Sequence, residues 1–196
     1  MSIIGKLSLG LIAAGASGAV LATEFNSMQP DQSRITFTAK QMNVPVNGKF
    51  GKFSAQLAFD PAKPEAGRAQ IDIDLNSIDA GSDEANEEVK RKAWFDTLNF
   101  PTARFVSTAI KSLGTDRYEA QGKLSIKGRN LDITAPIFFK PEGAGGRIEG
   151  SFTIKRLAYG IGDGEWADTA TVANEVVVKF SLFVVAAPSA ATKGKK

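Results

Sequence analysis

The sequence contains no cysteine and no histidine. These absences exclude disulfides and thiol chemistry, Ser-His-Asp catalysis, and imidazole ligation of a metal or haem. A strong excess of positive charge is also missing. The formal net charge is +3, and removing Lys6 and the three lysines of residues 193–196 leaves −1 for the body of the chain. A body without surplus positive charge does not favour a nucleic-acid partner.

Acidic residues gather in two short segments, 83–88 and 163–168. The first is better explained as the solvated face of a helix than as a general acid and base pair. The second offers carboxylates in a glycine-rich loop but lacks the remainder of an EF-hand pattern. We therefore expect neither an enzyme nor a metal site.

Residues 1–22 have the pattern of a secretory signal peptide. Lys6 supplies the positive start, an apolar Ala/Gly-rich stretch follows, and Val20 and Ala22 are the small residues expected before a cleavage site. The alternative is an uncleaved anchor. Cleavage after Ala22 would leave a periplasmic domain over residues 23–185 and a basic tail over residues 186–196, which we expect to be disordered.

Most of the remaining chain alternates apolar and polar residues with a period of two, which is typical of antiparallel strands. Asn47-Gly48 is a strong signal for a hairpin turn. The pattern predicts an all-β fold, a sandwich or an up-and-down barrel. Its eight strands are expected near residues 33–43, 53–59, 69–75, 103–113, 118–126, 131–139, 148–154 and 176–184.

The inward side chains of these strands mix large and small residues. Such a mixture is compatible with a barrel that holds a ligand and equally with a solid core in which large residues pack into small ones. The predicted apolar lining consists of Phe37, Leu57, Ile71, Ile73, Phe105, Leu124, Ile126, Ile137, Phe139, Phe152, Ile154, Val178 and Phe180.

One segment, 83–93, breaks the alternation and predicts a short helix. Ser82 can cap its start, and Ala85, Val89 and Ala93 fall on one face. The segment also contains acid-before-base pairs at i,i+4 spacing, Glu87 with Arg91 and Glu88 with Lys92. This helix is either a lid at a barrel opening or a plain crossover that covers part of the core.

Three aromatic residues are expected to close the ends of the barrel, namely Trp94, Phe95 and Trp166. For Trp166, which lies in a glycine-rich loop, contact with a partner is the alternative. Gln41 falls on the inward face of its strand, where the other residues are apolar. It therefore either contacts a ligand head group or lies at the solvent-exposed end of the strand. Apolar residues in the outward phase indicate a homodimer surface, or a face covered by other segments; they are Phe138, Val177 and Phe183.

Four segments together resemble the YceI-like family of bacterial periplasmic proteins: SRITFTAKQMNVPVNGKFGKFSAQLAFDP, SIDAGSDEANEEVKRKAWFDTLNFPTARFVS, GKLSIKGRNLDITAPIFF and GSFTIKRLAYGIGDGEWAD. The resemblance implies a lipocalin-like, eight-stranded antiparallel β-barrel with one short helix near its opening. It also implies an interior that binds polyprenyl lipids or the tail of a quinone such as ubiquinone. Many relatives carry histidine where Gln41 and Lys127 stand here, so the part of the ligand near these residues is expected to differ.

These observations predict a non-catalytic periplasmic binding or carrier protein for a long-chain isoprenoid lipid or quinone. Burial of a tail of roughly 20 carbons would contribute on the order of 16 kcal/mol before association costs of about 4–15 kcal/mol. The alternative is an interaction module with a filled core. Such an interaction module would either associate with itself or dock on a membrane cytochrome of the b561 type. The second possibility follows from relatives with a similar GEWADT loop, some of which resemble companion proteins of these cytochromes.

Overall fold

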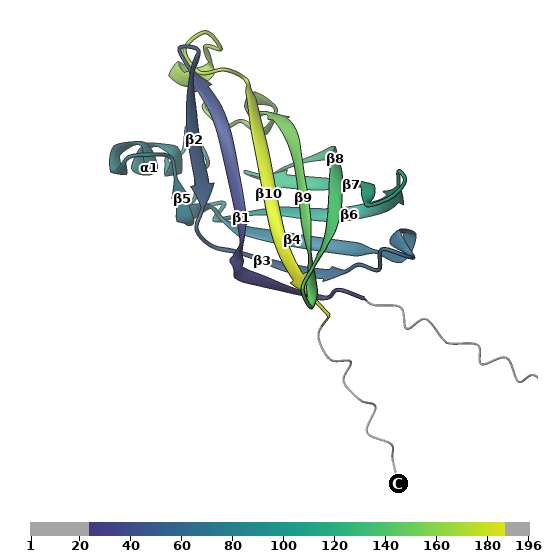
Figure 1. Cartoon of the computed structure of the whole chain (residues 1–196). Helices are drawn as coiled ribbons and strands as arrows, with labels where there is room; N and C mark the ends of the chain where they lie inside the picture. The colour runs from purple at the N-terminus through teal and green to yellow at the C-terminus, as the bar shows by residue number, and fades with distance from the viewer. Residues whose placement is uncertain (1–23, 187–196) are drawn as a thin grey trace, which may run out of the picture.

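A computed structural model describes residues 24–186 of the chain (Figure 1). The described chain forms one antiparallel sheet in the order β3-β4-β6-β7-β8-β9-β10-β1-β2-β5. The strands are β1 (Ser27–Gln41), β2 (Val44–Phe50), β3 (Phe53–Ala58), β4 (Arg68–Asp74), β5 (Ile78–Asp79), β6 (Thr102–Ser112), β7 (Arg117–Ile126), β8 (Arg129–Glu142), β9 (Gly145–Lys155) and β10 (Glu175–Val185). The helices are α1 (Asp83–Lys90) and the 3-10 turns η1 (Pro64–Ala66), η2 (Leu75–Ser77), η3 (Arg156–Tyr159) and η4 (Gly164–Ala167).

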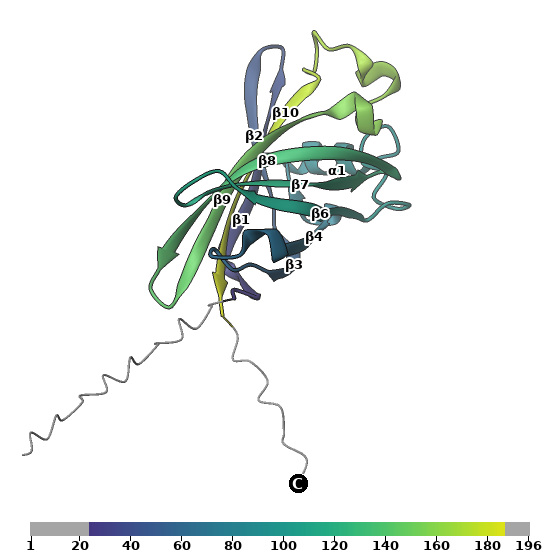
Figure 2. The same cartoon turned by 90° about the vertical axis from the view of Figure 1, so that its right-hand side faces the viewer.

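The sheet curls over itself into a half-barrel. In Figures 1 and 2 the strands β1, β2, β9 and β10 cross the group formed by β3, β4, β6 and β7 at a steep angle. Phe25 and Phe59 exchange two backbone hydrogen bonds, of 2.8 and 3.0 Å, which join the segment just before β1 to the end of the edge strand β3. The two ends of the described chain lie side by side there, since the Asn26 N–H donates to the Val185 carbonyl.

The predicted all-β class and the predicted helix are confirmed, whereas the strand count was too low. The eight expected strands correspond to β1, β3, β4 and β6–β10, and the sequence pattern missed β2 and β5. The predicted turn at Asn47-Gly48 is wrong, because both residues pair with β1 inside β2. The chain turns instead at Met42 and Asn43, whose φ angles of 48° and 63° are those of a tight two-residue hairpin.

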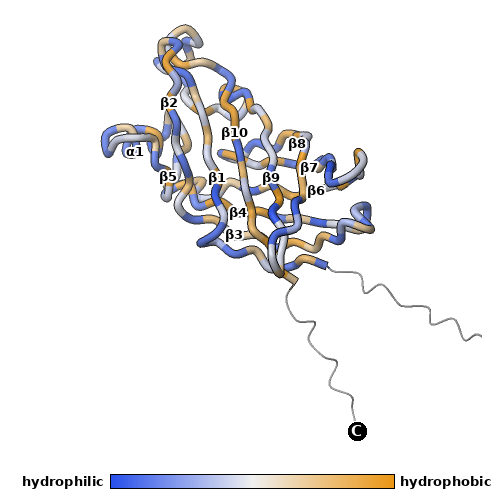
Figure 3. Tube along the Cα trace, in the orientation of Figure 1, coloured by the Kyte–Doolittle hydropathy of each residue, from blue (hydrophilic) through white to orange (hydrophobic). Residues whose placement is uncertain are grey.

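Apolar side chains fill one end of the half-barrel completely. Figure 3 shows the alternation of hydropathy along the strands that directs these side chains inward. Phe59 contacts Tyr118 and Phe139, with ring centroids 5.1 and 5.5 Å apart, and Phe25 contacts Phe139 at 5.0 Å. All four rings are buried. Aromatic residues at this density leave no room for a ligand at that end.

Inward phenylalanine rings lie over glycines of neighbouring strands at several positions, where a Cβ atom would overlap the ring. A large residue facing a glycine allows the interior to pack closely and stabilises glycine positions that are otherwise unfavourable in strands. The closest pairs are Phe37 with Gly48, Phe105 with Gly122, Phe139 with Gly146 and Phe180 with Gly150.

The helix begins where the sequence predicted and ends earlier. The Ser82 hydroxyl accepts the Ala85 N–H at 3.2 Å, so the predicted N-cap is confirmed. The backbone of Arg91 is extended, and α1 therefore stops at Lys90. The acid–base contacts are accordingly one residue closer than expected, at i,i+3, and join Glu87 to Lys90 and Glu88 to Arg91.

No helix within residues 24–186 combines the length and apolar character that a membrane crossing requires. The predicted signal peptide lies outside the described residues, as does the predicted tail apart from Ala186.

Candidate ligand-binding site

The end of the half-barrel opposite the aromatic cluster is hollow. It contains a cavity of about 400 Å³, within the range of small-molecule sites in proteins. Apolar side chains form most of its wall. The lining residues are Phe37, Ala39, Lys40, Gln41, Val46, Phe50, Ile73, Leu75, Ile78, Ala80, Glu84, Ala85, Glu88, Val89, Trp94, Phe95, Ala103, Leu124, Ile126, Phe152, Ile154, Arg156, Ile161, Trp166, Val172, Val176 and Val178.

The predicted lining divides between the cavity and the solid core. Seven of the thirteen residues line the cavity: Phe37, Ile73, Leu124, Ile126, Phe152, Ile154 and Val178. The other six are absent from its wall and pack in the core clusters instead: Leu57, Ile71, Phe105, Ile137, Phe139 and Phe180. Alternation predicted which side chains point inward, but it carries no information on how far a cavity extends along each strand.

The helix α1 forms part of the cavity wall. Ala85 and Val89, which the sequence placed on one helical face, both line the cavity. The exposed lining residues Lys40, Gln41 and Glu84 mark where the cavity opens to solvent, between α1 and the end of β1. Gln41 thus lies at the solvent-exposed end of β1, at the cavity mouth. Its contact with a ligand head group stays a prediction.

Arg156 is the most unusual residue of the site, because its charged side chain is 1% exposed. Within the described chain no carboxylate pairs with it. All five guanidinium N–H donors are instead taken up by backbone carbonyls, at distances of 2.6 to 3.1 Å. The accepting carbonyls belong to Ile161, Gly162, Trp166, Val172 and Ala173.

This arrangement organises the long loop between β9 and β10. The five accepting carbonyls are spread along the loop, so the guanidinium determines the path of the backbone that carries Trp166. Burial lowers the pKa of Arg156 from its ordinary value, but an arginine stays charged at physiological pH. Its guanidinium also lies 5.7 Å from the centre of the Trp94 ring, a cation–π contact. A buried cation is therefore built into the cavity wall.

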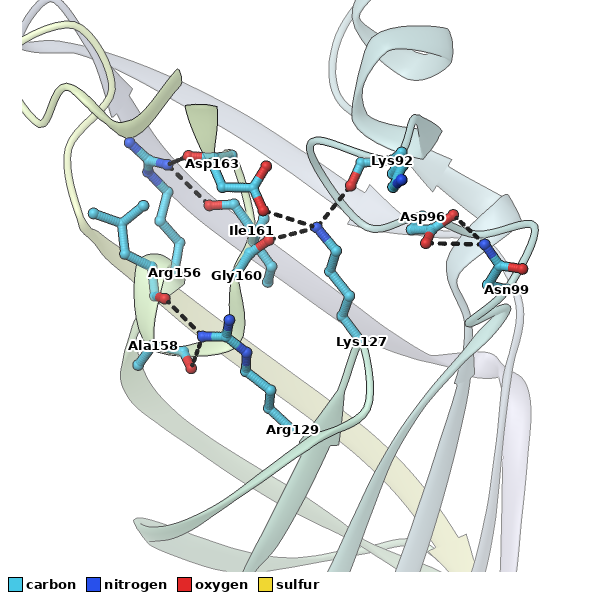
Figure 4. A network of polar contacts seen from close by, with 12 residues as sticks. Lys92, Asp96, Asn99, Lys127, Arg129, Arg156, Ala158, Gly160, Ile161 and Asp163 are labelled. Atoms are coloured by element: carbon cyan, nitrogen blue, oxygen red, sulfur yellow. Dashed lines mark hydrogen bonds and ion pairs between the residues drawn. The ribbon is translucent and has the colours of Figure 1, made fainter. Parts of the chain in front are cut away.

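A second basic residue, Lys127, joins this loop to the segment that follows α1 (Figure 4). Its Nζ donates to the Lys92 carbonyl at 2.7 Å and to the Gly160 carbonyl at 2.6 Å, and lies 3.7 Å from the Asp163 carboxylate. The two segments are also joined through the Ala93 carbonyl, which accepts the N–H groups of Gly162 and Asp163. These contacts hold the helix end and the loop together beside the cavity.

The three residues expected to close the barrel ends, Trp94, Phe95 and Trp166, all line the cavity. The rings of Trp94 and Trp166 are in contact, with centroids 5.5 Å apart and planes inclined by 51°. The indole Nε1 atoms of both are buried and have no hydrogen-bond acceptor among residues 24–186. The hydroxyl of Tyr159 on η3 is likewise buried without a partner there, and burial raises the pKa of Tyr159 to about 12.

Sequence reasoning missed Arg156 as part of the site. Its position directly after β9, in the stretch IKRLAYG, resembles that of an ordinary solvated arginine at a strand end. No local pattern distinguishes a guanidinium that will be enclosed by a distant loop. The run of glycines at 160, 162 and 164 is the nearest available signal, because all three adopt positive φ angles in the loop that encloses Arg156.

The outward apolar residues do not form a bare hydrophobic strip. Phe138 is 51% exposed on β8, and the Arg117 guanidinium lies 5.9 Å from its ring centre. Phe183 on β10 lies under Arg147 at 5.3 Å, and Val177 is half-buried. A homodimer and a cytochrome partner stay predictions.

In residues 24–186 the acidic side chains form no group of three that is placed to hold a metal ion.

The antiparallel sheet is curled, has an apolar cavity at one end, and has a helix in the cavity wall. These features define a β-barrel-like protein whose cavity is of the kind found in ligand-binding domains. The family model of the YceI-like domain matches residues 27–184, and the chain belongs to that family. The resemblance found in the sequence is therefore confirmed. A UPF0312 protein of Azotobacter vinelandii (strain DJ) is 27% identical over 165 residues, which cover 81% of this chain and 86% of the relative.

Solved structures agree with the fold. BcnA of Burkholderia cenocepacia is 44% identical, has a TM-score of 0.78, and is matched over 80% of this chain and 99% of its own. A polyisoprenoid-binding domain from Saccharophagus degradans, implicated in plant cell wall breakdown, is 20% identical with a TM-score of 0.63, over 85% of this chain and 99% of its own. At that identity the second comparison shows a shared fold alone.

Proposed function

We propose that this protein binds the apolar chain of an isoprenoid lipid or quinone in its cavity and carries it in the periplasm. The observation that carries the proposal is the cavity itself, whose wall is formed mainly by apolar side chains while its exposed polar residues, such as Lys40 and Glu84, lie at the mouth. Such a site favours an apolar chain that enters from one open end. The signal-peptide pattern predicted for residues 1–22 agrees with export from the cytoplasm.

The energetics support this class of ligand. Each buried CH₂ group contributes about 0.8 kcal/mol, so a long hydrocarbon chain can exceed the association cost of about 4–15 kcal/mol with few polar contacts. The name of the S. degradans neighbour, a polyisoprenoid-binding domain with the same fold, agrees with an isoprenoid chain. A non-catalytic role is supported by the absence of histidine and cysteine from the whole sequence.

Native mass spectrometry tests the proposal directly. The protein is purified without detergent from the periplasm of the bacterium that expresses it, and its mass is compared before and after solvent extraction. We expect a mass increment that matches a polyprenyl lipid or a quinone and disappears on extraction. A bare protein that also fails to take up an added isoprenoid quinone would overturn the proposal. Recovery of the protein from the cytoplasmic fraction would overturn its periplasmic part alone.

A further inference from the structure

We propose that one edge of β8 is an interaction surface, which takes an extended segment of a partner polypeptide as an added β-strand. This inference goes beyond the proposed function, because it concerns a strand edge and does not depend on the ligand of the cavity.

The first step concerns the place where β8 and β9 separate. β9 pairs with β8 only at residues 137–142 of β8, although β8 begins at Arg129. Residues 129–136 have β7 on one side, and the part of β9 beyond Gly150 pairs with β10 alone. Figure 2 shows the two strands running together from their hairpin and then diverging. Among residues 24–186 no strand fills this gap, so residues 129–136 form an open edge.

The second step identifies the backbone groups that face the gap. Lys127 and Gly128 both have positive φ angles and form the two-residue turn between β7 and β8. The residues that flank this turn, Ile126 and Arg129, are paired and exchange both of their backbone hydrogen bonds. Every second residue of β8, counted from Arg129, therefore directs its N–H and C=O groups toward β7. The residues between them direct both groups into the gap, and they are Asn130, Asp132 and Thr134.

The third step concerns the inward side chains along the open edge. They become more exposed where β9 is absent: Ala135 is buried, Ile133 is half-buried and Leu131 is 36% exposed. Leu124, the partner of Leu131 on β7, is only 5% exposed. Both leucines point inward, and Leu131 lacks a neighbouring strand on one flank. The open edge thus leaves apolar surface as well as backbone groups without cover.

The fourth step identifies the occupant by its chemistry. Three N–H and C=O pairs, spaced two residues apart, match the repeat of another extended backbone, as in strand addition to a sheet edge. No compact ligand has this repeat. An added strand would also place alternate side chains beside Leu131 and Ile133. The surface therefore favours an extended segment in which apolar and polar residues alternate.

The two ends of the surface limit the length of that segment. Pro136 has no N–H, so the ladder of donors stops before it. At the other end the Arg129 guanidinium donates to the carbonyls of Leu157 and Ala158 and lies across the gap. The added strand would accordingly pair with residues 130–134.

A peptide copied from β9 provides the probe. If the β8–β9 ladder continued in its register, residues 151–157 of a copy would lie opposite residues 130–136. The acetylated and amidated peptide SFTIKRL would then place its phenylalanine opposite Ala135 and its isoleucine opposite Ile133, both on the inward side. We expect this peptide to bind, with changes in the backbone resonances of ¹⁵N-labelled protein confined to the open edge and its surroundings.

Amide hydrogen exchange tests the pattern residue by residue. In the free protein the odd-numbered amides between 131 and 135 should exchange slowly, since β7 supplies their acceptors. The even-numbered amides between 130 and 134 should exchange about tenfold faster or more, and bound peptide should slow them. Slow exchange of both sets in the free protein would overturn the open edge.

Two N-methylated peptides distinguish strand addition from other contacts. The peptide nitrogen copied from Thr153 would face β8, so a methyl group on it should weaken binding about tenfold or more. The nitrogen copied from Ile154 would face away, and the peptide methylated there should bind like the unmodified one. Equal affinities of the two methylated peptides would overturn the proposal, as would the absence of binding by the unmodified peptide.

Thr134→Pro tests the same edge from the side of the protein. Proline removes an N–H that faces the gap while the hydrogen bonds to β7 remain, and circular dichroism verifies the fold. Peptide binding should weaken about tenfold. Thr134→Ala is the matched control, since it keeps the N–H and should bind the peptide like the parent protein. Unchanged binding by a folded Thr134→Pro variant would contradict the proposed edge.

Sedimentation velocity identifies a competing occupant. The protein alone is expected to sediment identically with and without the Thr134→Pro substitution. A dimer that this substitution dissociates would overturn the partner polypeptide, because a second copy of the chain would then occupy the edge.

Discussion

The ring of Phe37 on β1 lies directly over Gly48 on β2, its partner in the strand ladder. A Cβ atom at Gly48 would overlap that ring and would also approach the Asp79 carbonyl. The Thr38 hydroxyl donates to the Asn47 side-chain oxygen at 2.7 Å across the same pair of strands. Asn47 and Gly48, which read as a turn in sequence, therefore serve as strand residues that accommodate a ring of the cavity wall.

Gly48→Ala should lower the free energy of unfolding by about 1–3 kcal/mol, because the added methyl group displaces the Phe37 ring. Urea denaturation of the variant and the parent protein measures the difference. Gly51→Ala is the matched control, since a Cβ there meets its nearest neighbour at an ordinary 3.4 Å. In a Phe37→Ala background the same Gly48→Ala change should cost less than in the parent, since only the Asp79 carbonyl remains in its way. Equal effects at both glycines would contradict the overlap.

Phe152→Asp should abolish binding of an isoprenoid quinone, because Phe152 lines the cavity and an ionised carboxylate there would be buried without a partner. Thr153→Asp is the control: Thr153 follows on the same strand and is exposed. Quinone binding is measured by quenching of tryptophan fluorescence, with circular dichroism to verify folding. The milder Phe152→Ala should weaken binding without introducing charge. Binding retained in a folded Phe152→Asp variant would remove Phe152 from the lining.

Arg156→Met should destabilise the protein by about 3–5 kcal/mol, since it leaves five backbone carbonyls without their donor. Arg156→Lys keeps the charge but supplies three donors on a shorter side chain, so its loss should be smaller. Chemical denaturation gives the stabilities, and hydrogen exchange of residues 160–173 reports on the loop. A Met variant as stable as the parent would show that the carbonyls do not depend on the guanidinium.

Stability should fall between pH 10 and pH 12 as a result of Tyr159. Its pKa of about 12 in the folded protein exceeds the ordinary value of 10. The folded state therefore keeps the proton that the unfolded state loses, and folding becomes less favourable as the pH rises through this window. A difference of two units corresponds to about 2.7 kcal/mol. Denaturation midpoints at pH 9, 10, 11 and 12 measure the loss.

Tyr159→Phe provides the comparison for that pH dependence. The variant should show a shallower loss above pH 10, with the remainder arising in part from Tyr118, whose pKa is also raised by burial. At neutral pH it should be as stable as the parent or more stable by about 1 kcal/mol, because the Tyr159 hydroxyl has no partner within residues 24–186. An unchanged alkaline slope would exclude Tyr159 as the source.

Local patterns in the sequence determined much of the fold. Alternation with period two depends on neighbouring residues alone, and it identified eight of the strands and their inward faces. The Ser82 cap also follows from adjacent residues, as does the start of α1. The same reasoning failed at Asn47-Gly48, since a strong local turn signal was outweighed by the packing of Phe37, which lies on the paired strand.

By itself, then, the sequence determined the all-β class, the inward phase of each strand and membership of the YceI-like family. The tertiary structure alone decided which inward residues, such as Phe152, face a cavity and which, such as Phe139, fill the closed end. It also decided the burial of Arg156 and the meeting of Trp94 with Trp166. The physical reason is that the direction in which a side chain points depends on the backbone of its own strand. The volume of the cavity, the burial of the Arg156 guanidinium and the contact between the two tryptophan rings depend instead on segments that meet only in the folded protein.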